Sequence, residues 1–256
     1  MNRQCNRRHR HCLAGRAPAR QQAVCPRLMS GLTATNNRPH YQGMHWRFLE
    51  LSLPTTDIQA SLGFYRDLGF AELETGDIRD YAYAVISDGR IALGLHAGGL
   101  DAPALSFVQP NTATWARQLE AAGFELAFQR LGSDAFHECA IVSPGGGLAV
   151  LMEAPTFSGS ADDAQPLTGP SSYLGLHCPD LDAGLRFWEL AGLVADADDD
   201  QSPGDTAELA APGLRLKLMS SRTGQVSLRY PFPEPDWLER LSRFGLAPQR
   251  ESDCLV

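Results

Sequence analysis

The chain has 256 residues, 43% of them hydrophobic and 20% charged, which is typical of soluble globular proteins and enough for one large or two medium-sized domains. No run of about 18 apolar residues occurs, which excludes a membrane-spanning helix. The formal net charge is −8, and residues 1–43 contribute +8 from eight arginines with no acidic residue, so the remainder carries −16 and disfavours a nucleic-acid-binding surface.

Residues 1–43 form a basic leader without helical or strand periodicity and are predicted to be disordered. Three interpretations remain open: translated sequence upstream of a true start at Met29 or Met44, an organellar targeting segment, or a nucleic-acid-binding arm. The first is favoured because Met44 comes immediately before the first predicted strand. The leader lacks the apolar stretch of about 7 to 15 residues that a secretory signal needs, so a reducing cytoplasm is the expected location.

The first predicted unit has the order strand, helix and three strands. Alternation over residues 46–53 predicts a strand, with one face formed by Leu49, Leu51 and Leu53 and the other by Phe48, Glu50 and Ser52. Thr56 or Asp57 can cap a helix that Gly69 ends. Strands are expected next at 71–74, 81–86 and 91–95, the last two joined by a hairpin turn at Asp88-Gly89.

The same order returns in the rest of the chain. The second unit has a strand around Leu105 and Phe107, a helix at 112–122 closed by Gly123, and strands at 125–129, 136–142 and 148–153. Residues 156–170, rich in Ser, Gly, Pro and Asp, are predicted to be a linker. The third unit begins with a strand at 173–178 and ends with one at 214–219; the fourth begins near Val226, has a helix at 236–244 and lacks its last one or two strands.

One phrase of the first unit recurs in the third, 123 residues later. An aspartate, a leucine, two aromatic residues and a glycine stand at matching positions: Asp57, Leu62, Phe64, Tyr65 and Gly69, and Asp180, Leu185, Phe187, Trp188 and Gly192. Self-similarity at fixed spacing indicates one supersecondary unit used more than once. One helix over a small sheet cannot cover both sheet faces, so the units are expected to pair with their concave faces enclosing a cavity.

The repeated phrase and the βαβββ order resemble the vicinal oxygen chelate superfamily, which includes glyoxalase I, extradiol dioxygenases, fosfomycin-modifying enzymes and bleomycin-binding proteins. The resemblance covers about residues 44–250. It implies an α+β fold of four tandem βαβββ modules in two pairs, the last incomplete. Residues 44–155 would form one glyoxalase-like domain and residues 171–256 a second.

In metal-using members of that superfamily the ligands are His, Glu or Gln on the inward faces of the first and last strands of paired modules. The first-strand position, seven residues before the helix-starting aspartate, is Glu50 in the first unit and near Ala104 in the second. For the last strands, carrying the repeat register back makes His96 face the cavity, with Glu153 as its match. Counting from the Asp88-Gly89 turn instead places Leu93 and Val150 there, and a slip of one residue inverts every side chain.

Under the first count, Glu50, His96 and Glu153 are candidate ligands for Fe(II), Mn(II), Ni(II) or Zn(II). Under the second, Glu50 stands alone as a candidate catalytic general base or as the anionic partner of a cationic ligand. The competing interpretations are an ion pair of Glu50 with an arginine, a surface-loop position for His96, and a strand terminus for Glu153.

Tyr173 and His177 share one face of a predicted strand and are candidate substrate-binding residues of a second cavity; a hydrogen-bonded core histidine is the alternative for His177. His137 and Glu138 are adjacent in a strand, so they are expected to point in opposite directions. The glycines at 145–147 follow a proline and precede a strand, which predicts a hairpin and no phosphate-binding loop, and hence no nucleotide cofactor.

Three functions are compatible with the sequence. The first is a divalent-metal-dependent lyase, isomerase or dioxygenase that uses Glu50, with or without His96 and Glu153. The second is a metal-free protein that sequesters an aromatic or cationic small molecule in an acidic cleft, as bleomycin-binding proteins do. The third is a degenerate, structural member. The open edge of the incomplete fourth module predicts either a truncated chain or a second chain that covers it, as in a homodimer.

Overall fold

A computed structural model of the chain describes residues 46–145, 147–159, 161–167, 169, 171, 173–195, 205–220, 226–230 and 237–245. The predictions for the leader 1–43 and for the chain after residue 245 lie outside these residues. Within the described residues, no helix is both long and apolar enough to cross a membrane. The elements are β1 (Arg47–Pro54), α1 (Ile58–Asp67), β2 (Ala71–Thr75), β3 (Tyr83–Ser87), β4 (Ala92–His96), β5 (Ala104–Val108), α2 (Thr112–Ala121), β6 (Leu126–Arg130), β7 (Glu138–Val142), β8 (Leu148–Met152), β9 (Phe157–Ser158), β10 (Tyr173–Cys178), α3 (Leu181–Leu190), β11 (Val194–Ala195), β12 (Thr206–Ala211), β13 (Leu214–Ser220), β14 (Val226–Arg229) and α4 (Trp237–Arg243).

The strands form two mixed sheets, which confirms the predicted α+β class. One has the order β6-β7-β8-β5-β1-β4-β3-β2-β9 and the other β11-β12-β13-β10-β14. At the centre of the first, β1 pairs antiparallel with β5 and parallel with β4, and β5 pairs parallel with β8. The run strand, helix, three strands begins at β1, β5 and β10, and each time the last strand lies beside the first. The predicted total of four modules stays a prediction, because the chain after β14 is described only in part.

The helix starts follow the predicted capping chemistry. Asp57 accepts a hydrogen bond from the backbone N–H of Ala60 at 2.9 Å, and Asp180 accepts one from that of Ala183 at 2.9 Å. After α1, Gly69 has φ of +86°, and a Cβ there would lie 2.0 Å from the carbonyl oxygen of Gln165. Glycine is therefore required for the turn and for close approach of the segment 161–167.

The predicted alternation along β1 is wrong before Glu50, where Phe48 and Leu49 lie on the faces opposite to those predicted. The pairing of β1 with β5 is irregular between Phe48 and Glu50, the signature of a β-bulge. A bulge changes the direction of the side chains on one side of it. Leu49 accordingly packs with Val150 and Met152 on the concave side of the sheet, whereas Leu51 packs in the main core with the helices.

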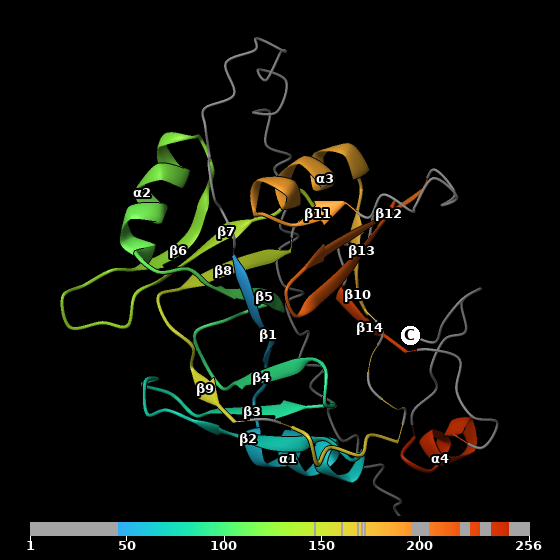
Figure 1. Cartoon of the computed structure of the whole chain (residues 1–256). Coiled ribbons are helices and arrows are strands. Elements are labelled where there is room, and N and C mark those ends of the chain that lie inside the picture. Colours follow the sequence, from blue (N-terminus) through green and yellow to red (C-terminus); the bar gives the residue numbers. More distant parts are fainter. Residues whose placement is uncertain are drawn as a thin grey trace, which may run out of the picture.

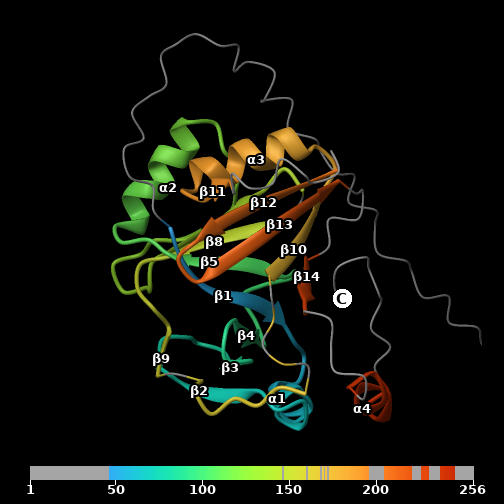
Figure 2. The same cartoon turned by 45° about the vertical axis from the view of Figure 1, so that its right-hand side comes forward.

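The main core joins the two sheets. Figures 1 and 2 show α1 at one end of the large sheet and α2 and α3 side by side at the other. The ring centroid of Phe107, on β5, lies 5.5 Å from that of Trp46 and 5.9 Å from that of Trp188, which belongs to α3. The ring centroids of Phe124 and Phe187 are 6.0 Å apart. These helices cover the convex side, so the concave side of the large sheet is the remaining place for a site.

Candidate active site

Glu50 and His96 meet on the concave side of the large sheet. The parallel pairing of β1 with β4 sets Ser52 beside Gly94 and Pro54 beside His96, so Glu50 and His96 share the sheet face on which Gly94 lies. Their side chains are 0% and 1% exposed, and Glu50 Oε1 lies 2.9 Å from His96 Nε2. The alternative that His96 is a surface-loop residue is therefore wrong.

A chain of hydrogen bonds surrounds the Glu50 carboxylate. Oε1 accepts from the Ser52 hydroxyl at 2.7 Å and Oε2 from the Tyr83 hydroxyl at 2.6 Å. Each hydroxyl has one proton, so Ser106 must donate to Ser52 (2.7 Å) and Thr156 must donate to Tyr83 (2.7 Å). With the imidazole proton on Nε2, His96 is the third donor and its Nδ1 accepts from Tyr81, and the three donors compensate the complete burial of the carboxylate. Its partners are hydroxyls and an imidazole, not the arginine that one interpretation of the sequence expected.

Burial also fixes the protonation of the two tyrosines. Desolvation, followed by the charge of Glu50 and its hydrogen bond, raises the pKa of Tyr83 far above its ordinary value. Desolvation likewise raises the pKa of Tyr81, whose hydroxyl lies 3.1 Å from Nδ1 of His96. Both phenols therefore keep their protons at neutral pH and can act as hydrogen-bond donors.

Gly94 makes the burial of Glu50 possible. A Cβ at position 94 would lie 2.2 Å from Glu50 Oε1, closer than any two such atoms can approach. We expect Gly94→Ala to force the carboxylate out of its hydrogen bonds and to lower the free energy of unfolding by about 1–3 kcal/mol, the usual cost of overpacking. Urea unfolding checks this, with Gly63→Ala as the control, because a Cβ at Gly63 has nothing within 4 Å. Equal losses in the two variants would contradict the explanation.

The structure does not bring Glu153 to Glu50 and His96. The β5–β8 pairing sets Ser106 beside Val150 and Val108 beside Met152, so Met152 stands where His96 stands in the first half, and Ala104 stands where Glu50 does. Glu153 is one residue further on and faces His137, with 3.1 Å between its Oε2 and Nδ1. The prediction from the repeat register is therefore correct in placing His96 on the concave face. The prediction from the Asp88-Gly89 turn is correct in placing Val150 there.

This donor set does not fit a transition metal held by the protein. Among the described residues, no group of three or more His, Cys, Asp and Glu side chains is arranged to hold a metal ion. Such sites ordinarily use at least three protein ligands. Here one half of the sheet offers Glu50 and His96, while the matching positions in the other half, Ala104 and Met152, offer no hard donor.

A second buried ionic cluster, which the sequence did not predict, lies beside the first. Glu138 of β7 is 3% exposed and receives hydrogen bonds from two arginines: Arg79, 2.6 Å away, and Arg130. Arg79 comes from the loop between β2 and β3, is 6% exposed, and lies 5.7 Å from the ring centres of Tyr81, Tyr83 and Phe136. Burial acts to lower the pKa of Arg79, but the charge of Glu138 and its hydrogen bond raise it above its ordinary value. Arg79 therefore remains a cation.

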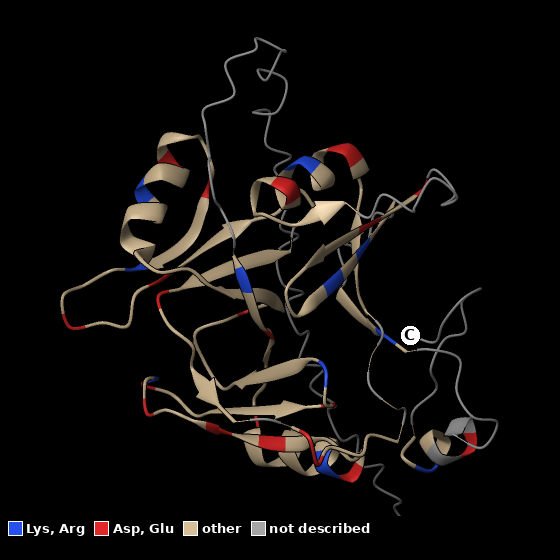
Figure 3. Ribbon diagram, viewed as in Figure 1, with Lys and Arg blue, Asp and Glu red and all other residues tan. Residues whose placement is uncertain are grey.

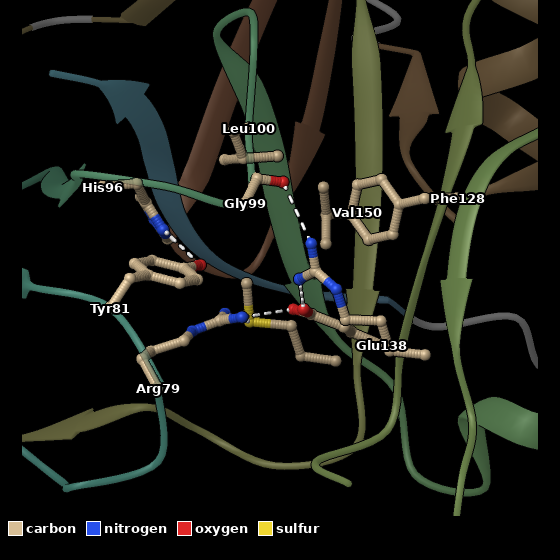
Figure 4. A pocket seen from close by; sticks show the side chains of 10 residues that line it. Arg79, Tyr81, His96, Gly99, Leu100, Phe128, Glu138 and Val150 are labelled. Carbon is tan, nitrogen blue, oxygen red and sulfur yellow. Dashed lines mark hydrogen bonds and ion pairs between the residues drawn. The ribbon is translucent and has the colours of Figure 1, made fainter. Parts of the chain in front are cut away.

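The two clusters meet in one pocket, shown in Figure 4. His96 and Tyr81 line one side, the Arg79–Glu138–Arg130 cluster lines another, and the apolar wall is formed by Leu100, Phe128, Val150 and Met152. The lining side chains pack closely, so the pocket is nearly filled. His137, adjacent to Glu138 in sequence, instead contacts Glu153 and the carbonyl of Gly132, so the two point in opposite directions as predicted.

The pocket is not the acidic cleft that the charge of the chain suggested. It has two guanidinium groups for one carboxylate besides the Glu50–His96 pair. Figure 3 shows that acidic residues gather instead around α1 and β2, where Asp67, Glu72 and Glu74 are exposed. These exposed residues contribute to the acidity of the chain without lining the pocket.

Tyr173 and His177 lie on β10, in the smaller sheet. Tyr173 is half-buried, with its ring centre 5.5 Å from Nζ of Lys217, and His177 is half-buried opposite Met219. Neither lines the pocket beside Glu50. Their role in substrate binding stays a prediction.

No family model and no curated protein matches the sequence. Solved structures do match the fold. Homoprotocatechuate 2,3-dioxygenase from Arthrobacter globiformis gives a TM-score of 0.57 at 14% identity, over 80% of this chain and 71% of that one. The enzyme from Brevibacterium fuscum, in complex with 3,4-dihydroxyphenylacetate, gives 0.57 at 14% identity, over 81% and 72%. A catechol 2,3-dioxygenase gives 0.52 at 14% identity, over 80% and 78%.

Proposed function

We propose that this chain, which has the fold of the extradiol dioxygenases and thus of the vicinal oxygen chelate superfamily, binds a small organic molecule in the pocket beside Glu50 and His96 without a metal held by the protein. The observation that carries the proposal is the lining of the pocket, an apolar wall with a few convergent polar groups, which is the composition usual for a small-molecule site. One of the structural relatives is named as a complex with a small organic molecule, 3,4-dihydroxyphenylacetate.

The donor set on this face supports the metal-free form, because the described residues supply no third His, Cys, Asp or Glu side chain beside Glu50 and His96. Glu50 already has three hydrogen-bond donors, and Met152 and Ala104 stand at the matching positions of the second half. The carboxylate and the imidazole are instead connected through Tyr81 to the pocket. They orient the Tyr81 hydroxyl, whose oxygen can accept a hydrogen bond from a ligand.

Thermal unfolding with a library of small organic acids, amines and neutral aromatics tests this proposal. We expect at least one class of compound to raise the melting temperature, because a ligand that binds only the folded state stabilises it. Leu100→Trp, which fills the pocket, should abolish this protection. Val142→Trp adds the same ring at a position that is 38% exposed and outside the pocket, and should retain it. Protection that is equal in the two variants, or absent with every compound, would overturn the proposal.

A second candidate is a metal-dependent lyase, isomerase or dioxygenase. One observation favours it: the 2.9 Å between Glu50 Oε1 and His96 Nε2 matches two adjacent ligands of one ion with bonds of about 2.0–2.2 Å. The relatives named above are dioxygenases.

Metal analysis of the purified protein distinguishes the two candidates. We expect no stoichiometric Fe, Mn, Ni or Zn, and no rise in melting temperature when these ions are added, because Glu50 and His96 alone make an incomplete set of ligands. The control is His96→Ala. Stoichiometric metal that this variant loses would establish the second candidate in place of the first.

A further inference from the structure

We infer that the ligand of this pocket is a small organic anion, a carboxylate or a phosphate on an apolar body, and that it binds by taking donors from the Arg79–Glu138–Arg130 cluster. The inference rests on the proposed small-molecule function and names the class of the ligand. Two observations support it: the cluster has two guanidinium groups for one carboxylate, and some N–H groups of Arg79 lack a good acceptor.

The cluster has an excess of positive charge, with Arg79 buried and Arg130 at its solvent-exposed side. Two guanidinium groups share the single carboxylate of Glu138, and Arg79 is 6% exposed. A buried cation without full compensation is costly, because the interior solvates it poorly. Glu138 and the surrounding aromatic rings compensate Arg79, and a further anion would supply a carboxylate or phosphate for the second guanidinium group.

The donors of Arg79 are also incompletely used. A guanidinium has five N–H groups. In Arg79, Nη1 donates to Glu138, Nη2 approaches only the sulfur of Met152 at 3.5 Å, and the buried Nε has no hydrogen-bond partner among the described residues. A thioether is a weak acceptor, so an entering carboxylate or phosphate would find two better-matched positions on this side chain.

Arg130 provides the entrance and the second donor. Its side chain is 41% exposed and spans from Glu138 to the carbonyl of Gly99, 3.3 Å away. Rotation of this exposed side chain away from Glu138 and the Phe128 ring would open the nearly filled pocket, and the ligand anion would replace the lost ion pair. The apolar part of the ligand then lies on Leu100, Phe128 and Val150, while the Tyr81 hydroxyl stands next to the arginines.

The test compares probes that share one body and differ in charge. We expect benzoate or phenyl phosphate to raise the melting temperature, whereas benzamide, phenol and benzylamine do not. The carboxylate and phosphate arms identify which anion the site prefers. Arg130→Gln should weaken the binding of the effective anion about tenfold or more, the value of a lost charge-assisted hydrogen bond. Arg117→Gln removes an equal charge from an exposed position on α2 and should leave binding unchanged.

Glu138→Gln separates a ligand site from a merely structural ion cluster. Removing the competing carboxylate should tighten binding of the effective anion several-fold, whereas a structural cluster would only lose stability. Neutral or cationic probes that protect as well as the anions, in a manner blocked by Leu100→Trp, would overturn the anion inference and leave the proposed function standing. Protection by none of these probes, while other library compounds protect, would have the same consequence; protection by no compound at all overturns both.

Discussion

Glu138→Ala is expected to lower the free energy of unfolding by about 3–5 kcal/mol, the cost of removing one partner of a buried ion pair. The loss is large because Arg79 stays behind as a cation that is 6% exposed, and desolvation is no longer balanced by a carboxylate. Urea unfolding monitored by tryptophan fluorescence measures it. A double variant, Arg79→Met with Glu138→Leu, should recover most of the loss, because no charge then remains buried at Arg79.

Glu153→Ala is the matched control for this experiment. Glu153 also pairs with a basic side chain of the same hairpin, His137, but the two side chains are 35% and 29% exposed. Pairs that solvent reaches contribute less than about 1 kcal/mol. If the two substitutions cost the same, the burial of Glu138 does not have the energetic effect described here.

Glu50→Ala is the second substitution with a large expected effect, about 3 kcal/mol or more, because three buried donors lose their acceptor at once. The contribution of one hydrogen bond is measured by a double-mutant cycle with Tyr83→Phe. We expect a coupling free energy of about 1–3 kcal/mol, as for residues of one buried network.

Tyr65→Phe is the control for the cycle. Burial also raises the pKa of Tyr65, but its ring packs against Phe64 and Phe70, away from Glu50. Its coupling with Glu50→Ala should be below about 0.5 kcal/mol, as for distant sites. Coupling of similar size in both cycles would show that Tyr83 acts through general destabilisation and not through its hydrogen bond.

Much of the site could be predicted where a local pattern determines position. The aspartate caps, the helix-ending glycines and the repeat follow from turn and helix chemistry, and the count of seven residues back from Asp57 correctly points to Glu50 as an inward residue. The repeat register also gives the correct face for His96. These features depend on residues near one another in sequence or on a period of the chain.

The other features of the site depend on contacts between distant residues, which produce no periodic pattern in the sequence. The bulge between Phe48 and Glu50 reverses the faces of Phe48 and Leu49, and no proline or glycine marks it. In the second half, the residue that corresponds to His96 is Met152, one residue before the predicted Glu153. Only the pairing of β8 with β5 determines this register. Arg79 lies in an irregular loop and meets Glu138, 59 positions away, so neither residue type nor spacing indicated the pair.

The segment after β8 has a consequence for how this chain tolerates change. Thr156 donates to Tyr83, Phe157 and Ser158 extend the sheet from β2, and Gln165 and Leu167 hydrogen-bond to Gly69 and Leu68. The segment predicted to be a linker therefore packs along the first half of the large sheet. It is connected to the buried carboxylate of Glu50 through two hydrogen bonds, from Thr156 to Tyr83 and from Tyr83 to Glu50. Insertions or deletions in this segment would therefore shift Thr156 and Tyr83 and weaken the hydrogen bond to Glu50, so the length of the segment is constrained by its contacts with the sheet.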